Sequence, residues 1–159
     1  MKLIMTVLFL LLSLCCIPLA AADRLDLDKA VKIGSGKTMV IEFTDPDCPF
    51  CRRGSAFFRG RQDVTRYIFF NPLAIHPQAK EKAQYILSAR NKAQAYEEML
   101  SGKLDGRKPG GITAEGIKLL EEHMAAAKEA NVTGTPTFII CGRIIAGFDQ
   151  QKLEQALGK

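Results

Sequence analysis

The apolar positions of the chain form either short continuous runs or longer spaced patterns, and these indicate strands and helices respectively. Residues 38–44 (TMVIEFT) and 64–70 (VTRYIFF) are almost continuously apolar and rich in β-branched and aromatic residues, which is typical of strands buried on both faces. Two shorter apolar runs, 137–140 and 143–146, are joined by only two residues. This spacing predicts a β-hairpin.

Helical spacing of apolar residues occupies much of the remaining chain. Residues 48–62 predict a helix with Pro49 among its first positions, where proline is tolerated. Residues 78–101 predict one bent helix or two, and residues 113–130 predict another that is capped by Thr113. The face that we expect this last helix to bury consists of Ile117, Leu120, Met124 and Ala127.

The resulting order is β-α-β, a helical block, and then β-β-α, with the final helix starting at Asp149. Residues 25–33 are interpreted as a short entry segment that Gly34-Ser35-Gly36 ends. No internal repeat, low-complexity segment or linker divides the chain. The expected fold class is therefore α/β, in a single domain.

The first 22 residues have the pattern of a cleaved signal peptide. Lys2 precedes an apolar run over residues 3–16, and Ala20-Ala21-Ala22 supplies the small residues of a cleavage site before Asp23. We therefore expect export, and a mature domain of residues 23–159.

Two alternatives for this segment stay open. An uncleaved signal anchor is disfavoured by Pro18, and lipid attachment is disfavoured because no small residue directly precedes Cys15 or Cys16. Cleavage would remove two of the five cysteines of the chain and leave Cys48, Cys51 and Cys141.

Composition excludes several classes of protein. The chain has 159 residues, of which 47% are hydrophobic and 25% charged, so it is neither disordered nor fibrous. Its 22 Lys and Arg residues against 17 Asp and Glu residues give a net charge of +5 that is spread along the sequence. We expect no nucleic-acid partner, because even the basic loop at 103–108 is short enough to be simply solvated.

The candidate chemistry lies in Cys48-Pro49-Phe50-Cys51, at the end of a buried strand and the start of a helix. A two-residue spacer allows both sulfurs to form a disulfide, and the positive end of the helix dipole stabilises a thiolate at the first cysteine. This predicts Cys48 as the nucleophile and Cys51 as the resolving thiol. Half of a metal site and a purely structural disulfide are the alternatives. We expect no metal and no cofactor, because the mature chain has no second close pair of ligands.

Residues 43–52 (FTDPDCPFCR) resemble the active-site stretch of the DsbC/DsbG-type periplasmic disulfide isomerases of the thioredoxin-like superfamily. Residues 134–137 (GTPT) resemble the second signature of that family, and the resemblance continues over about residues 37–158. It implies a thioredoxin-like mixed sheet flanked by helices, with a helical insertion between the second strand and the strand that follows a cis-proline. It also implies that Pro136 is cis beside the cysteines, and that Thr135, Pro49 and Phe50 contact substrate.

Glu42 is a charged residue in an otherwise apolar strand, six residues before Cys48. Burial of such a charge is costly unless it is partnered or neutral. In thioredoxin and the DsbA-type oxidases, an acid at the equivalent place moves a proton for the buried cysteine, and the resemblance implies that Glu42 does this for Cys51. DsbC and DsbG usually have an apolar residue there. The alternative is a solvated glutamate that faces an edge of the sheet.

Several other polar residues are further candidates. Arg52 and Arg53 follow the motif, where they either stabilise a thiolate or are solvated. His76 and His123 are expected in a loop and on a helix surface, outside the catalytic machinery. Cys141 is expected to be an exposed thiol in the hairpin turn, either incidental or paired between molecules.

The resemblance implies a periplasmic thiol:disulfide oxidoreductase that acts on protein cysteines in the reducing or isomerising direction and receives electrons from a membrane thiol reductant. Relatives of that type carry an N-terminal dimerisation domain, whereas only residues 23–37 precede the first long strand here. We therefore expect a monomer. Two other functions on the same fold stay open: a non-catalytic peptide-binding or chaperone module, and a metallochaperone.

Overall fold

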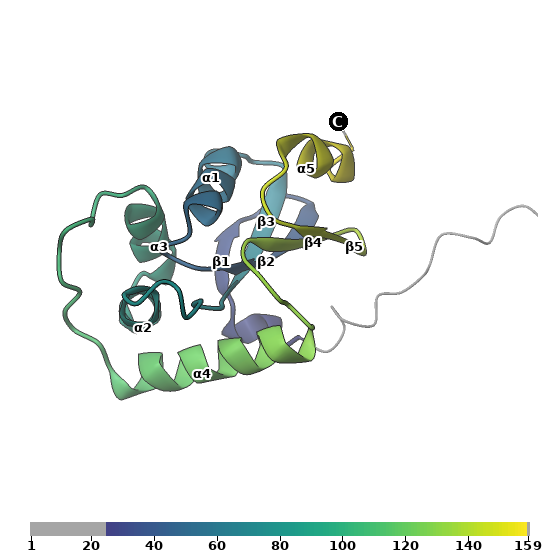
Figure 1. The fold of residues 1–159 in the computed structure, drawn as a ribbon. Coiled ribbons are helices and arrows are strands. Elements are labelled where there is room, and N and C mark those ends of the chain that lie inside the picture. The colour runs from purple at the N-terminus through teal and green to yellow at the C-terminus, as the bar shows by residue number, and fades with distance from the viewer. Residues whose placement is uncertain (1–24, 159) are drawn as a thin grey trace, which may run out of the picture.

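A five-stranded mixed sheet forms the centre of the molecule in the computed structural model, which describes residues 25–158 (Figure 1). The spatial order is β1-β3-β2-β4-β5. In chain order the strands are β1 (Val31–Gly34), β2 (Thr38–Thr44), β3 (Val64–Phe70), β4 (Thr137–Ile140) and β5 (Arg143–Ala146). The predicted mixed α/β fold is confirmed, and the four strands expected from the sequence lie where they were predicted.

The two long strands, β2 and β3, are parallel neighbours, and every other pairing in the sheet is antiparallel. Because β2 also pairs with β4, it lies in the middle of the sheet and both of its faces are covered. This explains its nearly continuous apolar sequence. The parallel pairing brings Thr44 and Phe70, the last residues of β2 and β3, to the same edge of the sheet.

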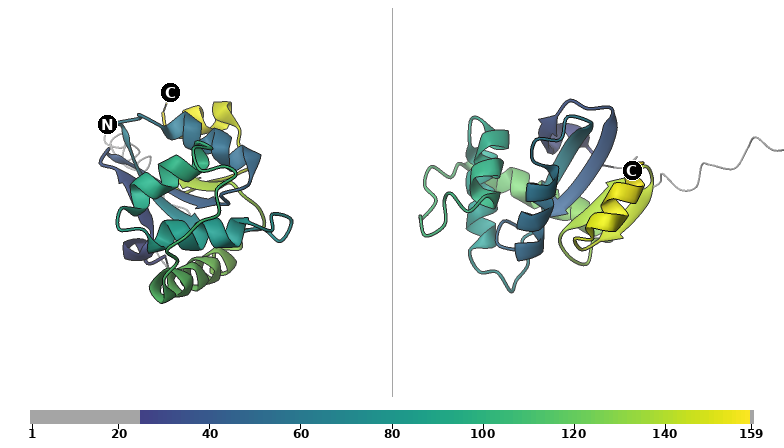
Figure 2. Two further views of the ribbon diagram at one scale, coloured as in Figure 1. Left: turned by 90° about the vertical axis from the view of Figure 1, so that its left-hand side faces the viewer. Right: turned by 90° about the horizontal axis from the view of Figure 1, so that it is seen from above.

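Helices cover both faces of this sheet (Figures 1 and 2). The helices are α1 (Pro49–Phe58), α2 (Ala79–Ser88), α3 (Lys92–Leu100), α4 (Ala114–Glu129) and α5 (Gln150–Ala156), with a short 3-10 turn at Leu27–Lys29. Residues of α1, α3 and α5 pack on the face of β2 that carries Val40 and Glu42, while α4 packs on the opposite face. The predicted helical block is thus three helices, α2, α3 and α4.

The buried face of α4 differs from the expected one. Ile117 and Met124, expected in the core, are 40% and 38% exposed, and the buried residues are Gly116, Leu120, His123 and Ala127. The helix is rotated because Gly116 permits close approach to α2, where an added Cβ would lie 2.0 Å from the Ser88 hydroxyl oxygen.

The entry segment contains a strand that the sequence pattern did not indicate. Residues 31–34 form β1 and pair antiparallel with β3. With four residues and a lysine at its second position, β1 has too short an alternation to be recognised by pattern alone.

The predicted signal peptide, residues 1–22, lies outside the described residues. Within residues 25–158, no helix has the length and apolar character needed to cross a membrane.

Candidate active site

The cysteine motif lies where β2 ends and α1 begins, as predicted. Cys48 is the N-cap of α1 with an extended backbone, and Pro49 is the first helical residue, where its missing N–H has no helical partner to lose. The amide of Arg52 donates to the Cys48 carbonyl oxygen at 3.1 Å and closes the first turn. Cys51 lies in that turn and points into the core.

The two thiols differ in their surroundings. Cys48 is 4% exposed, and its Sγ donates to the backbone carbonyl of Thr135 at 3.4 Å. Cys51 is fully buried, and its Sγ accepts the backbone N–H of Asp45 at 3.3 Å. Both are free thiols in this structure. The predicted order of burial, with Cys51 deeper than Cys48, is confirmed.

Burial raises the pKa of the Cys51 thiol far above its ordinary value. The Asp45 N–H and the nearby hydroxyls of Thr44 and Thr135 lower this pKa only in part, and the neighbouring Cys48 raises it further. At neutral pH Cys51 is therefore a protonated thiol, and it needs a proton acceptor before it can attack a disulfide.

The loop before β4 closes over the motif from the other side of the site. The Thr135–Pro136 peptide bond is cis, as the resemblance implied. This loop places the Thr135 carbonyl against Cys48. The Thr135 hydroxyl is buried and, like that of Thr44, makes no hydrogen bond of ordinary geometry among the described residues.

Asp45 organises the site, although sequence reasoning assigned it only to a turn. Its buried carboxylate accepts the N–H groups of Asp47 at 2.7 Å and Cys48 at 3.2 Å through Oδ1. Through Oδ2 it contacts the N–H of Leu73 at 2.8 Å and His76 Nδ1 at 2.9 Å. An aspartate just before a Pro-containing turn is a signal for such side-chain-to-backbone bonding.

Glu42 is fully buried in the central strand β2, so the alternative of a solvated glutamate at a sheet edge is wrong. Its Oε2 accepts from Arg66 Nη2 at 2.7 Å and from Nε at 3.2 Å, and its Oε1 accepts from the Tyr96 hydroxyl at 3.0 Å. Burial lowers the pKa of Arg66, but Glu42, Tyr96 and Glu97 together more than offset this, so the guanidinium stays charged. Glu42 is thus a partnered buried charge.

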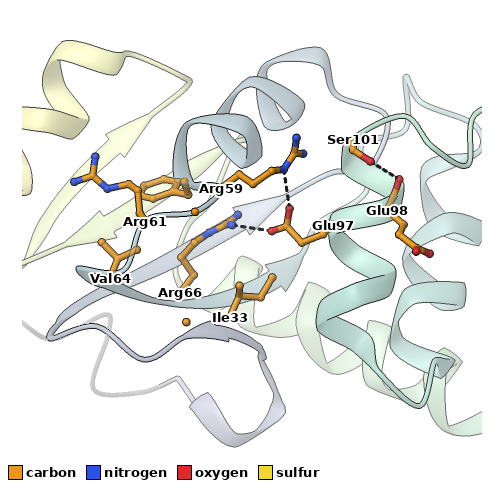
Figure 3. A pocket seen from close by; sticks show the side chains of 11 residues that line it. Ile33, Arg59, Arg61, Val64, Arg66, Glu97, Glu98 and Ser101 are labelled. Atoms are coloured by element: carbon orange, nitrogen blue, oxygen red, sulfur yellow. Dashed lines mark hydrogen bonds and ion pairs between the residues drawn. The ribbon is translucent and has the colours of Figure 1, made fainter.

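This buried network continues to the surface at the end of α1 away from the cysteines. Arg66 lies between the rings of Phe58 and Tyr96, 5.1 Å from each centroid, and its Nη1 reaches Glu97 at 3.4 Å. Glu97 also accepts from Arg59 at 3.3 Å. Figure 3 shows these arginines converging on Glu97 in the wall of a cavity of about 480 Å³.

The two arginines after the motif have separate surroundings. Arg52 forms a two-pronged ion pair with Asp105, at 2.6 and 2.7 Å, which ties α1 to the loop that follows α3. Arg53 stacks on the rings of Phe50 and Phe148, with its guanidinium carbon 5.9 and 4.8 Å from their centroids. Arg53 makes no ion pair with any residue that the structure describes. Phe50 itself is 51% exposed.

His123 was expected on a helix surface, and this prediction is wrong. It is fully buried under β3, where Nδ1 accepts the Phe70 N–H at 3.0 Å and Nε2 lies 2.8 Å from the Lys29 carbonyl oxygen. Burial lowers its pKa to about 4, so the ring is neutral and donates from Nε2. His76 is in a loop, as predicted. Cys141 is exposed in the β4–β5 turn, also as predicted.

Comparison with known proteins agrees with this arrangement. The family model described as a thioredoxin-like domain matches residues 25–158. The chain belongs to this thioredoxin-like family. The match covers every described residue. It therefore includes both the two cysteines at the start of α1 and the cis-proline loop that faces them.

Among solved structures, this thioredoxin-like chain is similar to the disulfide interchange protein from Neisseria gonorrhoeae, at 33% identity and a TM-score of 0.71 over 84% of this chain and 96% of that one. The catalytic domain of Proteus mirabilis ScsC shares the fold, at 22% identity and a TM-score of 0.66 over 89% of this chain and 97% of that domain.

Among curated proteins, it is 29% identical over 139 residues to the probable thiol:disulfide interchange protein DsbC of Bordetella parapertussis. It is also 31% identical over 117 residues to the protein of the same name in Bordetella avium. These matches cover 85% and 72% of this chain. The chain spans about half the length of these curated relatives, at 48% and 40%.

Proposed function

We propose that this chain is an exported thiol:disulfide oxidoreductase that exchanges disulfides with the cysteines of periplasmic proteins through Cys48 and Cys51. The observation that carries the proposal is that one thiol lies at the N-cap of a helix and a second thiol lies buried directly behind it. Cys48 lies at the start of α1 beside the Thr135 carbonyl, and Cys51 lies buried behind it. The names of the relatives, which are disulfide interchange proteins, support the same chemistry.

In the reducing direction, the Cys48 thiolate attacks one sulfur of a substrate disulfide and forms a mixed disulfide, while the other substrate sulfur leaves as a thiolate. Cys51 then gives up its proton and attacks the Cys48 sulfur. The Cys48–Cys51 disulfide forms and the second substrate sulfur is released. The substrate gains the two electrons that the dithiol loses, and a membrane thiol reductant would restore them. In isomerisation, a substrate thiolate attacks the mixed disulfide instead, with no net transfer of electrons.

Glu42 is the proposed acceptor of the Cys51 proton. It lies two residues before Thr44 on the same face of β2, and Thr44 is near enough to Cys51 to lower the pKa of that thiol. Tyr96 and Arg66 hold the carboxylate in place through hydrogen bonds. A fixed, buried carboxylate serves as a general base for a thiol of raised pKa when the proton passes to it directly or through one water molecule.

The substrate is proposed to lie along the Thr135 loop as an extended segment, with its cysteine facing Cys48. Strand addition of this kind uses backbone groups, which suits substrates of varied sequence. Pro49 and the half-exposed Phe50 form the adjoining surface between the two cysteines. We propose that the protein acts as a monomer.

An insulin-reduction assay tests the activity. The wild type should accelerate reduction of insulin by dithiothreitol, and Cys48→Ala should abolish the acceleration. Cys51→Ala should accumulate a mixed disulfide on Cys48, visible as an added mass that is lost on reduction. Equal rates with and without Cys48 would refute the oxidoreductase and favour a non-catalytic peptide-binding module. Metal content measured by mass spectrometry addresses the metallochaperone.

A further inference from the structure

The loop between β3 and α2 presents the most exposed large apolar side chain among the described residues. Ile75 is 77% exposed. Because β2 and β3 are parallel and end in register, this loop and the cysteine motif leave the sheet side by side. The Asn71 N–H donates to the Thr44 carbonyl oxygen at 2.8 Å, so a hydrogen bond holds the start of this loop to the end of β2, where the motif segment begins.

The loop is held against the motif by the carboxylate that also holds Cys48. Asp45 accepts the Cys48 N–H on one oxygen, and contacts the Leu73 N–H and the His76 ring on the other. The loop is closed on itself by a 2.9 Å bond from the His76 N–H to the Leu73 carbonyl oxygen. Ile75 lies between the two residues bound to Asp45, so its backbone is fixed relative to Cys48 at both sides.

We propose that Ile75 is a docking residue for protein substrates, and that it packs against an apolar side chain near the cysteine that reacts with Cys48. The inference rests on the proposed function. An apolar side chain held exposed on an ordered loop loses little conformational freedom when it binds, which favours association. The occupant is a flexible segment of a cysteine-containing protein, because only a polypeptide extends from Cys48 to a side chain on the neighbouring loop.

In the sheet, β3, which Ile75 follows, lies on one side of β2, and β5, which leads to the stack of Phe50, Arg53 and Phe148, lies on the other side. That stack belongs to α1 and the β5–α5 segment, whereas Ile75 follows β3. A substrate segment that crosses Cys48 can therefore meet an apolar contact at each side. A small disulfide such as glutathione disulfide needs only the Cys48 thiol in order to react. Discrimination between protein and small-molecule disulfides is the property that Ile75 should control.

The experiment compares Ile75→Ser with Ile144→Ser, which is a matched control. Ile144 is 63% exposed on β5, three strands away from β3 in the sheet. We expect Ile75→Ser to lower kcat/KM for insulin by about five-fold, the order that partial loss of one isoleucine contact gives. Its rate with glutathione disulfide should stay unchanged. Ile144→Ser should match the wild type with both substrates, and Ile75→Leu should retain the wild-type rate with insulin.

An equal loss with insulin and glutathione disulfide would show that the substitution disturbs Cys48, and it would overturn the docking role. Unchanged kinetics with insulin would overturn it as well. Binding of S-carboxymethylated insulin B chain, which cannot exchange disulfides, separates docking from catalysis. Ile75→Ser should weaken this binding even if the Cys48→Ala comparison refutes the oxidoreductase activity. Equal binding by the wild type and Ile75→Ser would overturn the docking role.

Discussion

At the residue scale, the site depends on buried charged side chains that are held by partners. Cys51 has a raised pKa because it is buried, and Glu42, the base proposed for its proton, is buried in β2 and bound by Arg66 and Tyr96. The motif cysteines could be predicted because their chemistry is local in sequence, and the cis bond at Pro136 followed from the family resemblance. The partners of Glu42 could not, because Arg66 and Tyr96 are 24 and 54 residues away and meet it only through the pairing of β2 with β3 and the packing of α3.

The proposed proton transfer predicts a specific defect in Glu42→Gln. The variant keeps the hydrogen-bond acceptor for Arg66 but cannot take up a proton, so resolution of the mixed disulfide should slow by about ten-fold at neutral pH. Quenched-flow measurements of the lifetime of the mixed disulfide at several pH values provide the readout. The wild-type and variant rates should converge at high pH, where hydroxide removes the proton. Identical pH profiles would eliminate this role for Glu42, and Glu98→Gln at the surface serves as the control.

His123 predicts a loss of stability in acid. Its pKa in the folded protein is about 4, below the ordinary value of 6.5, because the ring is buried. Between these pH values the His123 ring binds a proton in the unfolded chain but not in the folded one. The free energy of unfolding therefore falls as pH drops from about 6.5 towards 4. The loss reaches about 3 kcal/mol.

Urea unfolding of the wild type and His123→Asn at several pH values measures this effect. The asparagine Oδ1 can still accept the Phe70 N–H, so the variant should fold. The stability difference between the two proteins should shrink as pH falls through the window from 6.5 to 4. A difference that is constant across this window would contradict the assigned titration.

At the scale of elements, the packing of α4 on α2 explains why the existence of a helix was easier to predict than its buried face. The apolar residues of α4 repeat at helical spacing, so the helix itself was evident. Its rotation depends on Gly116 and His123, which a hydrophobicity pattern scores as neutral or polar. Gly116 meets Ser88 closely, and His123 replaces an apolar contact with two hydrogen bonds beneath β3.

The close approach at Gly116 predicts that Gly116→Ala destabilises the fold. An added Cβ would lie 2.0 Å from the Ser88 hydroxyl oxygen and 2.9 Å from the Ser88 backbone nitrogen. The side chain can rotate but the backbone cannot, so the two helices must separate, at a cost of about 1–3 kcal/mol. Gly110→Ala is the matched control, since nothing lies within 4 Å of a Cβ there. Equal thermal midpoints for the two variants would show that α4 adjusts freely.

At the scale of the whole molecule, the sheet order brings together segments that are distant in the chain. Placing β2 between β3 and β4 brings Thr135 to Cys48 across 87 residues and places the Ile75 loop beside the motif. The fold class and the two signature segments were predictable from the sequence and the resemblance. The role of Asp45 was not, because its importance arises from a loop that begins only after the next strand.

The surface predicts that the described domain is a monomer in solution. The exposed large apolar side chains are Met39, Phe50, Ile75, Ile117, Met124 and Ile144, and they are distributed over β2, α1, the β3–α2 loop, α4 and β5. A stable homodimer generally needs a continuous apolar area that such scattered residues do not provide. Sedimentation velocity at about 10 µM should therefore give the mass of one chain, and a concentration-dependent shift to twice that mass would contradict it.

The pairing of Glu42 with Arg66 also constrains how this sequence can change during evolution. Loss of Arg66 leaves Glu42 as an unpaired buried charge, which costs about 3–5 kcal/mol, a large part of the stability of an ordinary domain. Loss of Glu42 leaves the buried Arg66 with the partly exposed Glu97 as its remaining ion-pair partner. Replacement of both by apolar residues avoids that cost. The two positions should therefore covary: homologues with an apolar residue at the place of Glu42 should also lack the arginine at the place of Arg66, and lineages with only one of the two charges should be rare.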